Sequence, residues 1–176
     1  MTRLFSSTAP ADGFHLTSTT HIAFSNSDLF SNCSLHLYFS LPPLIFVDPY
    51  ELAHHARSYA FNHWGTANLE LPIHAVPQNN SRLLLTVSPE HDLWNSDDPN
   101  PEVNEVEFGL EIKVPLHLRY GDPRSNSGYH TAEMDWPTGF LACPQILQGF
   151  CEFYFRHFAS TRNSYFASTN RINTTP

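Results

Sequence analysis

The chain has 176 residues, which is consistent with one domain, and a formal net charge of −8 at pH 7. Its 9 Lys and Arg residues form no patch, which argues against nucleic acid and anionic membrane surfaces as partners, because both bind clustered basic residues. Aromatic residues make up 14% and charged residues 15% of the chain, a balance typical of a β-rich globular domain rather than a disordered one.

The N-terminal half contains short strand patterns separated by polar segments. Residues 1–31 are rich in Ser and Thr, so we expect a loosely ordered arm with one strand at most. Residues 33–41 alternate apolar and polar side chains, which predicts a strand, and the two following prolines end it because neither can donate to a ladder. Residues 44–47 and 82–87 predict two further strands.

Two interpretations compete for the segment after residue 47. Asp48, Pro49 and Glu51 are typical of a helix start, with a capping Asp, Pro at the first helical position and Glu three residues after the cap. No helix breaker follows for a dozen residues, so this helix would extend to about residue 63. In the alternative, the preceding strand continues through residue 52.

The most regular pattern lies at residues 105–120, where apolar and polar residues alternate with a period of two. This period predicts an extended strand with one apolar and one polar face. Pro115 cannot donate to a ladder, so we predict two consecutive strands, 105–114 and 116–120; the alternative is one long, bent edge strand. The apolar parity runs from Val106 to Tyr120, and the polar parity carries Glu107, Glu111, Lys113, His117 and Arg119.

Together these patterns predict an all-β, mainly antiparallel, β-sandwich-like domain over residues 32–144, with at most one short helix. Residues 129–136 contribute one more expected strand. Beyond residue 144 the periodicity is lost, and residues 145–176 form an atypical tail that we expect to be disordered. No apolar run reaches the ~18 residues of a membrane span, and the N-terminus lacks a convincing signal-peptide core.

No set of side chains has the spacing of a catalytic, cofactor or metal site. Three histidines would need one helical face to bind a metal, but their separations exceed two turns and no fourth ligand is evident: His54, His55 and His63. Three carboxylates share the polar parity of the long strand pattern, as in glycosidases, but such a face is ordinarily just solvated: Glu105, Glu107 and Glu111. We therefore predict no catalytic residue, cofactor or metal.

Two kinds of covalent modification are open to the chain. N-x-S/T patterns mark Asn32, Asn79 and Asn173 as candidate glycosylation sites, which matter only if the chain enters the secretory pathway. Three cysteines, Cys33, Cys143 and Cys151, permit one disulfide at most and leave one thiol.

Several segments, taken together, resemble the PIG-X family and its fungal counterparts. They occur in family order: CSLHLYFSLPPLIFVDPYEL at 33–52, WGTANLELP at 64–72, RLLLTV at 82–87, VPLHLRY at 114–120 and WPTGFLACP at 136–144. PLHLRY is the most distinctive of them, and the resemblance covers residues 33–144, about two-thirds of the chain.

The resemblance implies a lumenal β-rich domain at the endoplasmic reticulum membrane, although no membrane span is evident in this sequence. Residues 145–176 do not resemble the family's continuation, an ending that fits a truncated or mis-spliced product. It implies a non-catalytic accessory subunit that stabilises its partner, the multispanning catalytic subunit of GPI mannosyltransferase I, during GPI-anchor biosynthesis. It also favours the strand interpretation through residue 52, which leaves residues 53–63 as the helical candidate.

Within this interpretation, we expect partner contacts at His117 and Arg119, on the polar face of the most family-like strand. The alternative is that they solvate the strand or pair with Glu107 and Glu111. A disulfide between Cys33 and Cys143 is the candidate pairing, which the sequence leaves open.

Two other functions remain as alternatives. A carbohydrate-binding β-sandwich module would use tryptophans as stacking platforms: Trp64, Trp94 and Trp136. A hydrolase using the three glutamates is the more remote one.

Overall fold

The computed structural model describes residues 3–10, 13–24, 33–66, 68, 71–88, 94–95, 108–120, 130–147, 150–158 and 172–174. In chain order the described elements are β1 (Arg3–Ala9), β2 (His15–Phe24), β3 (Ser34–Leu41), β4 (Ile45–Phe46), α1 (Pro49–Ala53), β5 (Tyr59–Trp64), η2 (Ile73–Ala75), β6 (Ser81–Val87), β7 (Trp94–Asn95), β8 (Phe108–Leu118), β9 (His130–Ala132), β10 (Thr138–Leu147), β11 (Phe150–Phe158) and β12 (Ile172–Thr174).

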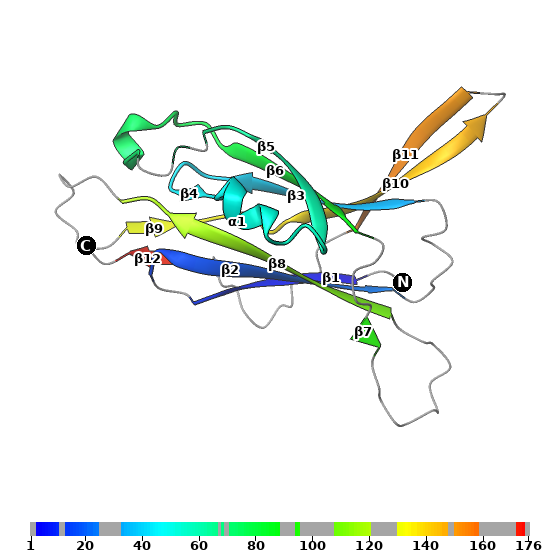
Figure 1. Ribbon diagram of the computed structural model, residues 1–176, viewed down its shortest axis with the longest axis horizontal. Helices are drawn as coiled ribbons and strands as arrows, with labels where there is room; N and C mark the ends of the chain where they lie inside the picture. Colours follow the sequence, from blue (N-terminus) through cyan, green and yellow to red (C-terminus); the bar gives the residue numbers. More distant parts are fainter. Residues whose placement is uncertain are drawn as a thin grey trace.

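These strands build two antiparallel five-stranded sheets (Figure 1). The first sheet has the order β1-β2-β8-β4, with β7 also pairing β8, and the second has the order β11-β10-β3-β6-β5. The short strands β9 and β12 pair separately. The expected all-β, mainly antiparallel sandwich is confirmed, as are the short strands predicted at 33–41, 44–47 and 82–87.

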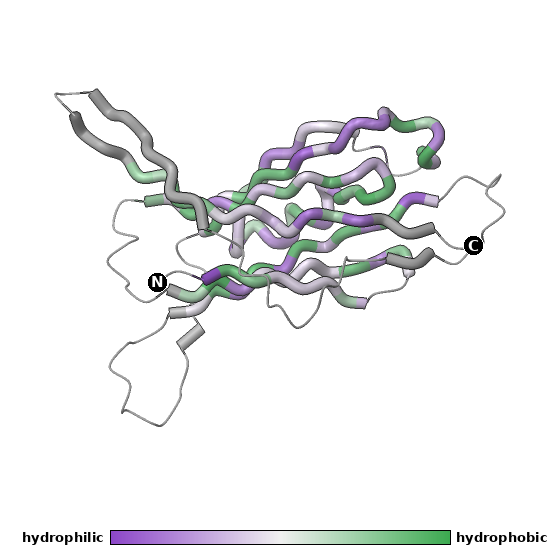
Figure 2. The backbone as a smooth tube through the Cα atoms, turned by 180° about the vertical axis from the view of Figure 1, so that it is seen from behind, coloured by the Kyte–Doolittle hydropathy of each residue, from purple (hydrophilic) through white to green (hydrophobic). Residues whose placement is uncertain are grey.

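The hydrophobic core lies between the two sheets. Strands that face it alternate buried and less buried residues. Strand β3 shows this alternation along its whole length, and β6 shows it over five residues. Apolar positions accordingly recur along the strands of both sheets (Figure 2). Fully buried members of the single core cluster come from both sheets, including Leu37, Phe39, Leu85, Ile112 and Val114.

Strand β8 is one strand that continues through Pro115, so the prediction of two consecutive strands is wrong. Leu118 donates its N–H to the Phe14 carbonyl on the β2 side, whereas Arg119 donates to the Leu44 carbonyl on the opposite side. N–H directions alternate along a strand, so Pro115 lacks its donor on the Arg119 side. On that side β8 pairs with β4 at residues 117–118 and with β7 at residues 108–109, so neither register includes Pro115. The missing N–H therefore breaks no ladder bond.

The segment after β4 begins as a helix and then becomes a strand. The Asp48 side chain accepts a hydrogen bond from the Tyr50 N–H at 2.8 Å, with Pro49 at the first helical position. Helix α1 ends at Ala53, and β5 pairs with β6 along its whole length. The capping interpretation was thus right about the helix start and wrong about its extent. A strand through residue 52, and a helix over 53–63, are both wrong.

Residues 1–31 are not the loosely ordered arm that the composition predicted. Strand β1 pairs with β2 over seven residues, and β2 pairs with β8 over ten. The inner positions of β2 include Ser18 and Thr20, both fully buried, with a hydrogen bond between Ser6 Oγ and Thr20 Oγ1. Hydroxyl groups at core positions hide the apolar alternation, so the sequence pattern is weak there.

The expectation of a disordered tail is also wrong where the tail is described. Strands β10 and β11 form a hairpin with nine register pairs, while β10 pairs with β3 only over residues 138–142. The far part of this hairpin therefore extends beyond β3, its neighbour in the second sheet (Figure 1). Residues 159–171 lie outside the described part. None of the helices in the described ranges combines the length and apolar character that crossing a membrane requires.

Candidate functional site

His117 connects three elements around the end of β8. Its Nε2 lies 2.5 Å from Glu51 Oε2 on α1. Its ring stacks on Phe46 at 5.2 Å and meets His15 edge-on at 4.8 Å, because β4 and β2 place these residues directly opposite it. With 15% of its side chain exposed, His117 is mainly an internal link between the sheet and the helix.

Arg119 is buried, with 3% of its surface exposed, so the alternative in which it merely solvates the strand is wrong. Strand β8 ends at Leu118, and the strict alternation ends with it: Tyr120, expected inside, is 71% exposed. Arg119 Nη1 donates to the carbonyls of Asn68 at 2.6 Å and Leu71 at 2.9 Å.

Among the described residues, no carboxylate forms an ion pair with this guanidinium. Its Cζ lies 4.5 Å from the centre of the Phe46 ring, which attracts a cation through its π face. Its Nη2 is buried and has no hydrogen-bond partner among the described residues. Burial lowers the pKa of Arg119, because desolvation disfavours the charged form.

Arg119 lines a cleft of about 140 Å³, which we call the Arg119 cleft. Its walls come from the turn and strand at β4, from the segment after β5 and from the segment before β6. Apolar walls include Pro43, Ile45, Phe46 and Val76, and polar ones include Thr66 and Asn79. Asp and Glu are not among the described residues that line it.

Gly65 allows the cleft to close against β6. It has a φ of +133°, a conformation that favours glycine, and a Cβ there would lie 2.5 Å from the Ser81 Cβ. Thr66 Oγ1 then accepts a hydrogen bond from the Asn68 N–H at 3.3 Å. This local turn brings the Asn68 and Leu71 carbonyls to Arg119.

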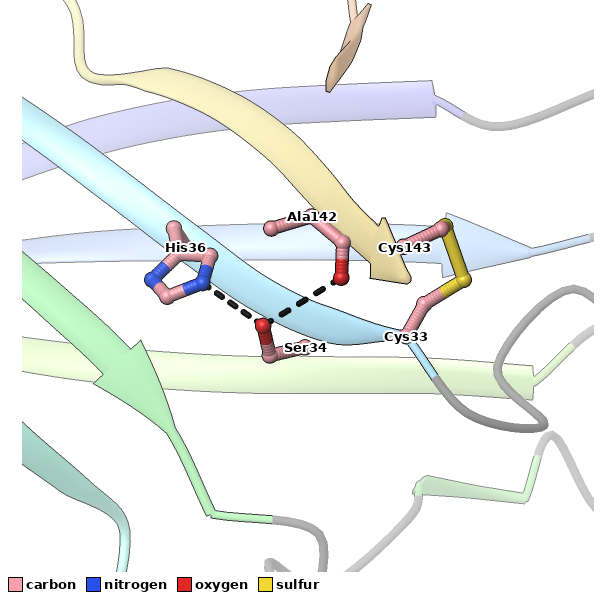
Figure 3. Close-up of a disulfide and its surroundings, with 5 residues drawn as sticks. All are labelled: Cys33, Ser34, His36, Ala142 and Cys143. Carbon is pink, nitrogen blue, oxygen red and sulfur yellow. Dashed lines mark hydrogen bonds between the residues drawn. A yellow bond between two sulfur atoms is a disulfide. The ribbon is translucent and has the colours of Figure 1, made fainter. Parts of the chain in front are cut away.

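A second structural centre lies at the start of β3 (Figure 3). A disulfide joins Cys33 to Cys143, where β3 and β10 are neighbours. Ser34 Oγ donates to the Ala142 carbonyl at 3.4 Å and is 2.8 Å from His36 Nε2, and Thr86 Oγ1 is 3.1 Å from His36 Nδ1. Burial lowers the pKa of His36, and this network suits a neutral imidazole that donates at one nitrogen and accepts at the other.

The three glycosylation candidates differ in what the structure describes. Asn79 is exposed at the rim of the Arg119 cleft. Asn32 lies outside the described residues, and Asn173 lies on β12, where only the backbone is described.

The residues weighed for other chemistry do not converge. Glu111 pairs with Lys113 at 2.6 Å and lies 3.6 Å from His21 Nδ1, whereas Glu105 and Glu107 lie outside the described residues. The tryptophans are dispersed: Trp64 ends β5 in the second sheet, Trp94 is on β7 in the first, and Trp136 lies between β9 and β10.

Sequence reasoning missed Glu51 as the partner of His117, as well as the cleft itself. The Asp48-Pro49 helix start did place Glu51 on a helix, but nothing in the sequence relates that helix to a strand 66 residues away. The cleft arises from long-range packing of the segments at β4, after β5 and before β6. Such packing leaves no periodic pattern in the sequence.

Comparison with known proteins assigns the chain to a family. The PIG-X / PBN1 family model matches residues 11–173. The chain belongs to the PIG-X / PBN1 family. The match includes β2 and β11, which lie outside the segments that first suggested the resemblance.

The PIG-X / PBN1 relatives that match are fungal. Protein PBN1 of Yarrowia lipolytica is 30% identical over 148 residues, covering 79% of this chain and 27% of the relative. Protein pbn1 of Aspergillus fumigatus is 34% identical over 121 residues, covering 64% of this chain and 22% of the relative. The chain thus spans about a quarter of the length of these relatives. No solved structure matches the chain.

Proposed function

We propose that this chain supplies the folded domain of a non-catalytic accessory subunit in GPI-anchor biosynthesis. Its partner is the multispanning catalytic subunit of GPI mannosyltransferase I, which it stabilises. The observation that carries this proposal is the family match over residues 11–173. In support, the polar side chains described around β8 form structural contacts: His117 with Glu51, and Arg119 with two backbone carbonyls.

Stabilisation without chemistry follows from mass action. A protein that binds the folded form of a partner but not its unfolded form raises the partner's stability by RT ln(1 + [L]/Kd), about 2.7 kcal/mol at a concentration of 100 Kd. A stabilisation of this size keeps a membrane enzyme out of the degradation pathways that remove unfolded chains.

The lumenal side of the endoplasmic reticulum membrane is the proposed location. The Cys33–Cys143 disulfide supports it, because such bonds persist in oxidising compartments. The exposed sequon at Asn79 supports it as well. We expect an endoglycosidase H-sensitive mobility shift that is smaller in the Asn79→Gln protein, because Asn32 and Asn173 are also candidate sites; equal shifts in the two proteins would remove this support.

The stabilising role is tested by depletion. The steady-state amount of the mannosyltransferase catalytic subunit is measured by quantitative immunoblot, with its messenger RNA as the control. We expect the subunit to fall on depletion, with unchanged messenger RNA, and to return on resupply. A subunit whose abundance never changes would overturn the proposed function.

A further inference from the structure

We propose that the Arg119 cleft binds an acidic side chain, Asp or Glu, presented by a segment of the partner protein. This inference rests on the proposed function for the identity of the partner. It names the place on the chain where that partner docks and the chemistry that recognises it.

Arg119 supplies the positive charge that would attract a carboxylate to the cleft. A buried guanidinium normally pairs with a carboxylate because its desolvation is costly, yet the described hydrogen bonds of Arg119 are to two neutral carbonyls. Nη2 is buried and unpartnered in the part of the chain that the structure covers. A carboxylate oxygen is the acceptor that matches a guanidinium N–H most strongly.

The shape of the cleft suits an acidic side chain rather than an isolated ion. A volume of about 140 Å³ is well above the roughly 10–15 Å³ that one water needs, and leaves room for a carboxylate with its methylene stem. The stem would lie against Ile45, Phe46 and Val76, and Thr66 offers a hydroxyl group. A phosphate would favour several cations, and Arg119 is the one Lys or Arg among the lining residues described.

Two exposed aromatic residues are sequence neighbours of residues that line the cleft. Trp64, 52% exposed, precedes Gly65 of the cleft wall, and Tyr120, 71% exposed, follows Arg119. Trp, Tyr and Arg are the residue types that carry most binding energy at protein interfaces. Because Nη2 is covered in this structure, the carboxylate reaches it by displacing wall residues such as Gly65 and Thr66, which belong to no strand.

A matched pair of variants at Thr66 tests the inference without removing Arg119. Thr66→Asp places a carboxylate in the cleft, which competes with the incoming acid and repels it. Thr66→Asn is the neutral control of the same size. At position 66, an Asp or Asn side chain can accept a hydrogen bond from the N–H of residue 68, as Thr66 Oγ1 does in the wild-type protein. Thermal unfolding of both purified proteins checks the fold.

The variants are introduced into the cell's own copy of the gene, and the abundance of the catalytic subunit is measured. We expect Thr66→Asp to weaken the interaction roughly tenfold or more relative to Thr66→Asn, and to lower the subunit further toward its depleted amount than Thr66→Asn does. If depletion lowers the catalytic subunit but its abundance is equal in cells with the two variants, the cleft is not the docking site. The proposed function is then unaffected. No effect even of depletion overturns the function itself.

Photo-crosslinking identifies the occupant directly. A photoreactive amino acid at position 66 is compared with one at Ala60, an exposed residue on β5. We expect position 66 alone to crosslink to a catalytic-subunit segment that contains Asp or Glu. Crosslinks to a segment without an acid, or to a phosphate-bearing lipid, overturn the proposal.

Discussion

At the scale of single residues, Arg119 shows how a cation serves as an internal brace. Its Nη1 holds the Asn68 and Leu71 carbonyls, and its guanidinium covers the Phe46 ring. A lysine keeps the charge but has no planar fork with which to bridge two carbonyls from one side. The residue that was expected to face the partner thus also organises the segment between β5 and β6.

We expect Arg119→Met to lower the free energy of unfolding by about 2 kcal/mol, because hydrogen bonds from a charged donor contribute about 1.5–3 kcal/mol and two carbonyls lose their partner. Arg119→Lys should fall between this variant and wild type. Urea unfolding measures both. Arg82, which is exposed on β6, provides the control: Arg82→Met should change stability by no more than about 0.5 kcal/mol. Equal losses at the two positions would contradict the bracing role.

His36 makes stability depend on pH. Burial lowers its pKa below the ordinary 6.5, so the unfolded chain binds the proton more tightly than the folded chain. The contribution of the neutral ring is complete above about pH 6.5 and is lost as the pH falls below it.

We therefore expect the free energy of unfolding to decline between about pH 7 and pH 5, and His36→Gln to reduce that decline. Burial also lowers the pKa of His63, which adds to the same slope. Chemical denaturation across this range measures it, with His74→Gln, at an exposed position, as the control. A slope unchanged by His36→Gln would show that His36 does not cause it.

At the scale of elements, the connection between β5 and β6 depends on one glycine. Gly65 and Gly13 both have positive φ, +133° and +111°, but only a Cβ at Gly65 meets another residue. We expect Gly65→Ala to cost more stability than Gly13→Ala, which carries the backbone strain alone. Because the added methyl would collide with Ser81, the difference should be about 1–3 kcal/mol in urea unfolding. Equal costs would show that Ser81 moves aside freely.

The sequence predicted the elements whose burial is regular. Strands β3 and β6, and the alternation of β8, were visible because Leu, Ile, Val and Phe occupy every second position. The cap at Asp48 was visible because capping is local chemistry. Strand β2 was hidden by its buried Ser18 and Thr20, and β5 was missed because its partner β6 is distant in the sequence. The alternation of buried and exposed side chains also fails at Arg119, because it holds only within a strand and β8 ends at Leu118.

At the scale of the whole molecule, the disulfide closes a large part of the chain into one loop. Cys33 and Cys143 are 110 residues apart. We expect the Cys33→Ala, Cys143→Ala protein to lose about 2–4 kcal/mol, largely because its unfolded state regains the freedom that the crosslink removes. Urea unfolding with and without reductant measures this, and reductant should no longer affect the double variant. A wild-type protein whose free energy of unfolding does not change on reduction would contradict the Cys33–Cys143 disulfide.

Because of the same disulfide, a cut in the backbone need not release a fragment of the chain. A single proteolytic cut anywhere between Cys33 and Cys143 yields two polypeptides that remain one covalent molecule. Strands β3 and β10, next to the bond, belong to one sheet and would still hold their register. A nicked copy would thus migrate as intact protein until it is reduced, and it could persist in the cell as a two-chain form of the same domain.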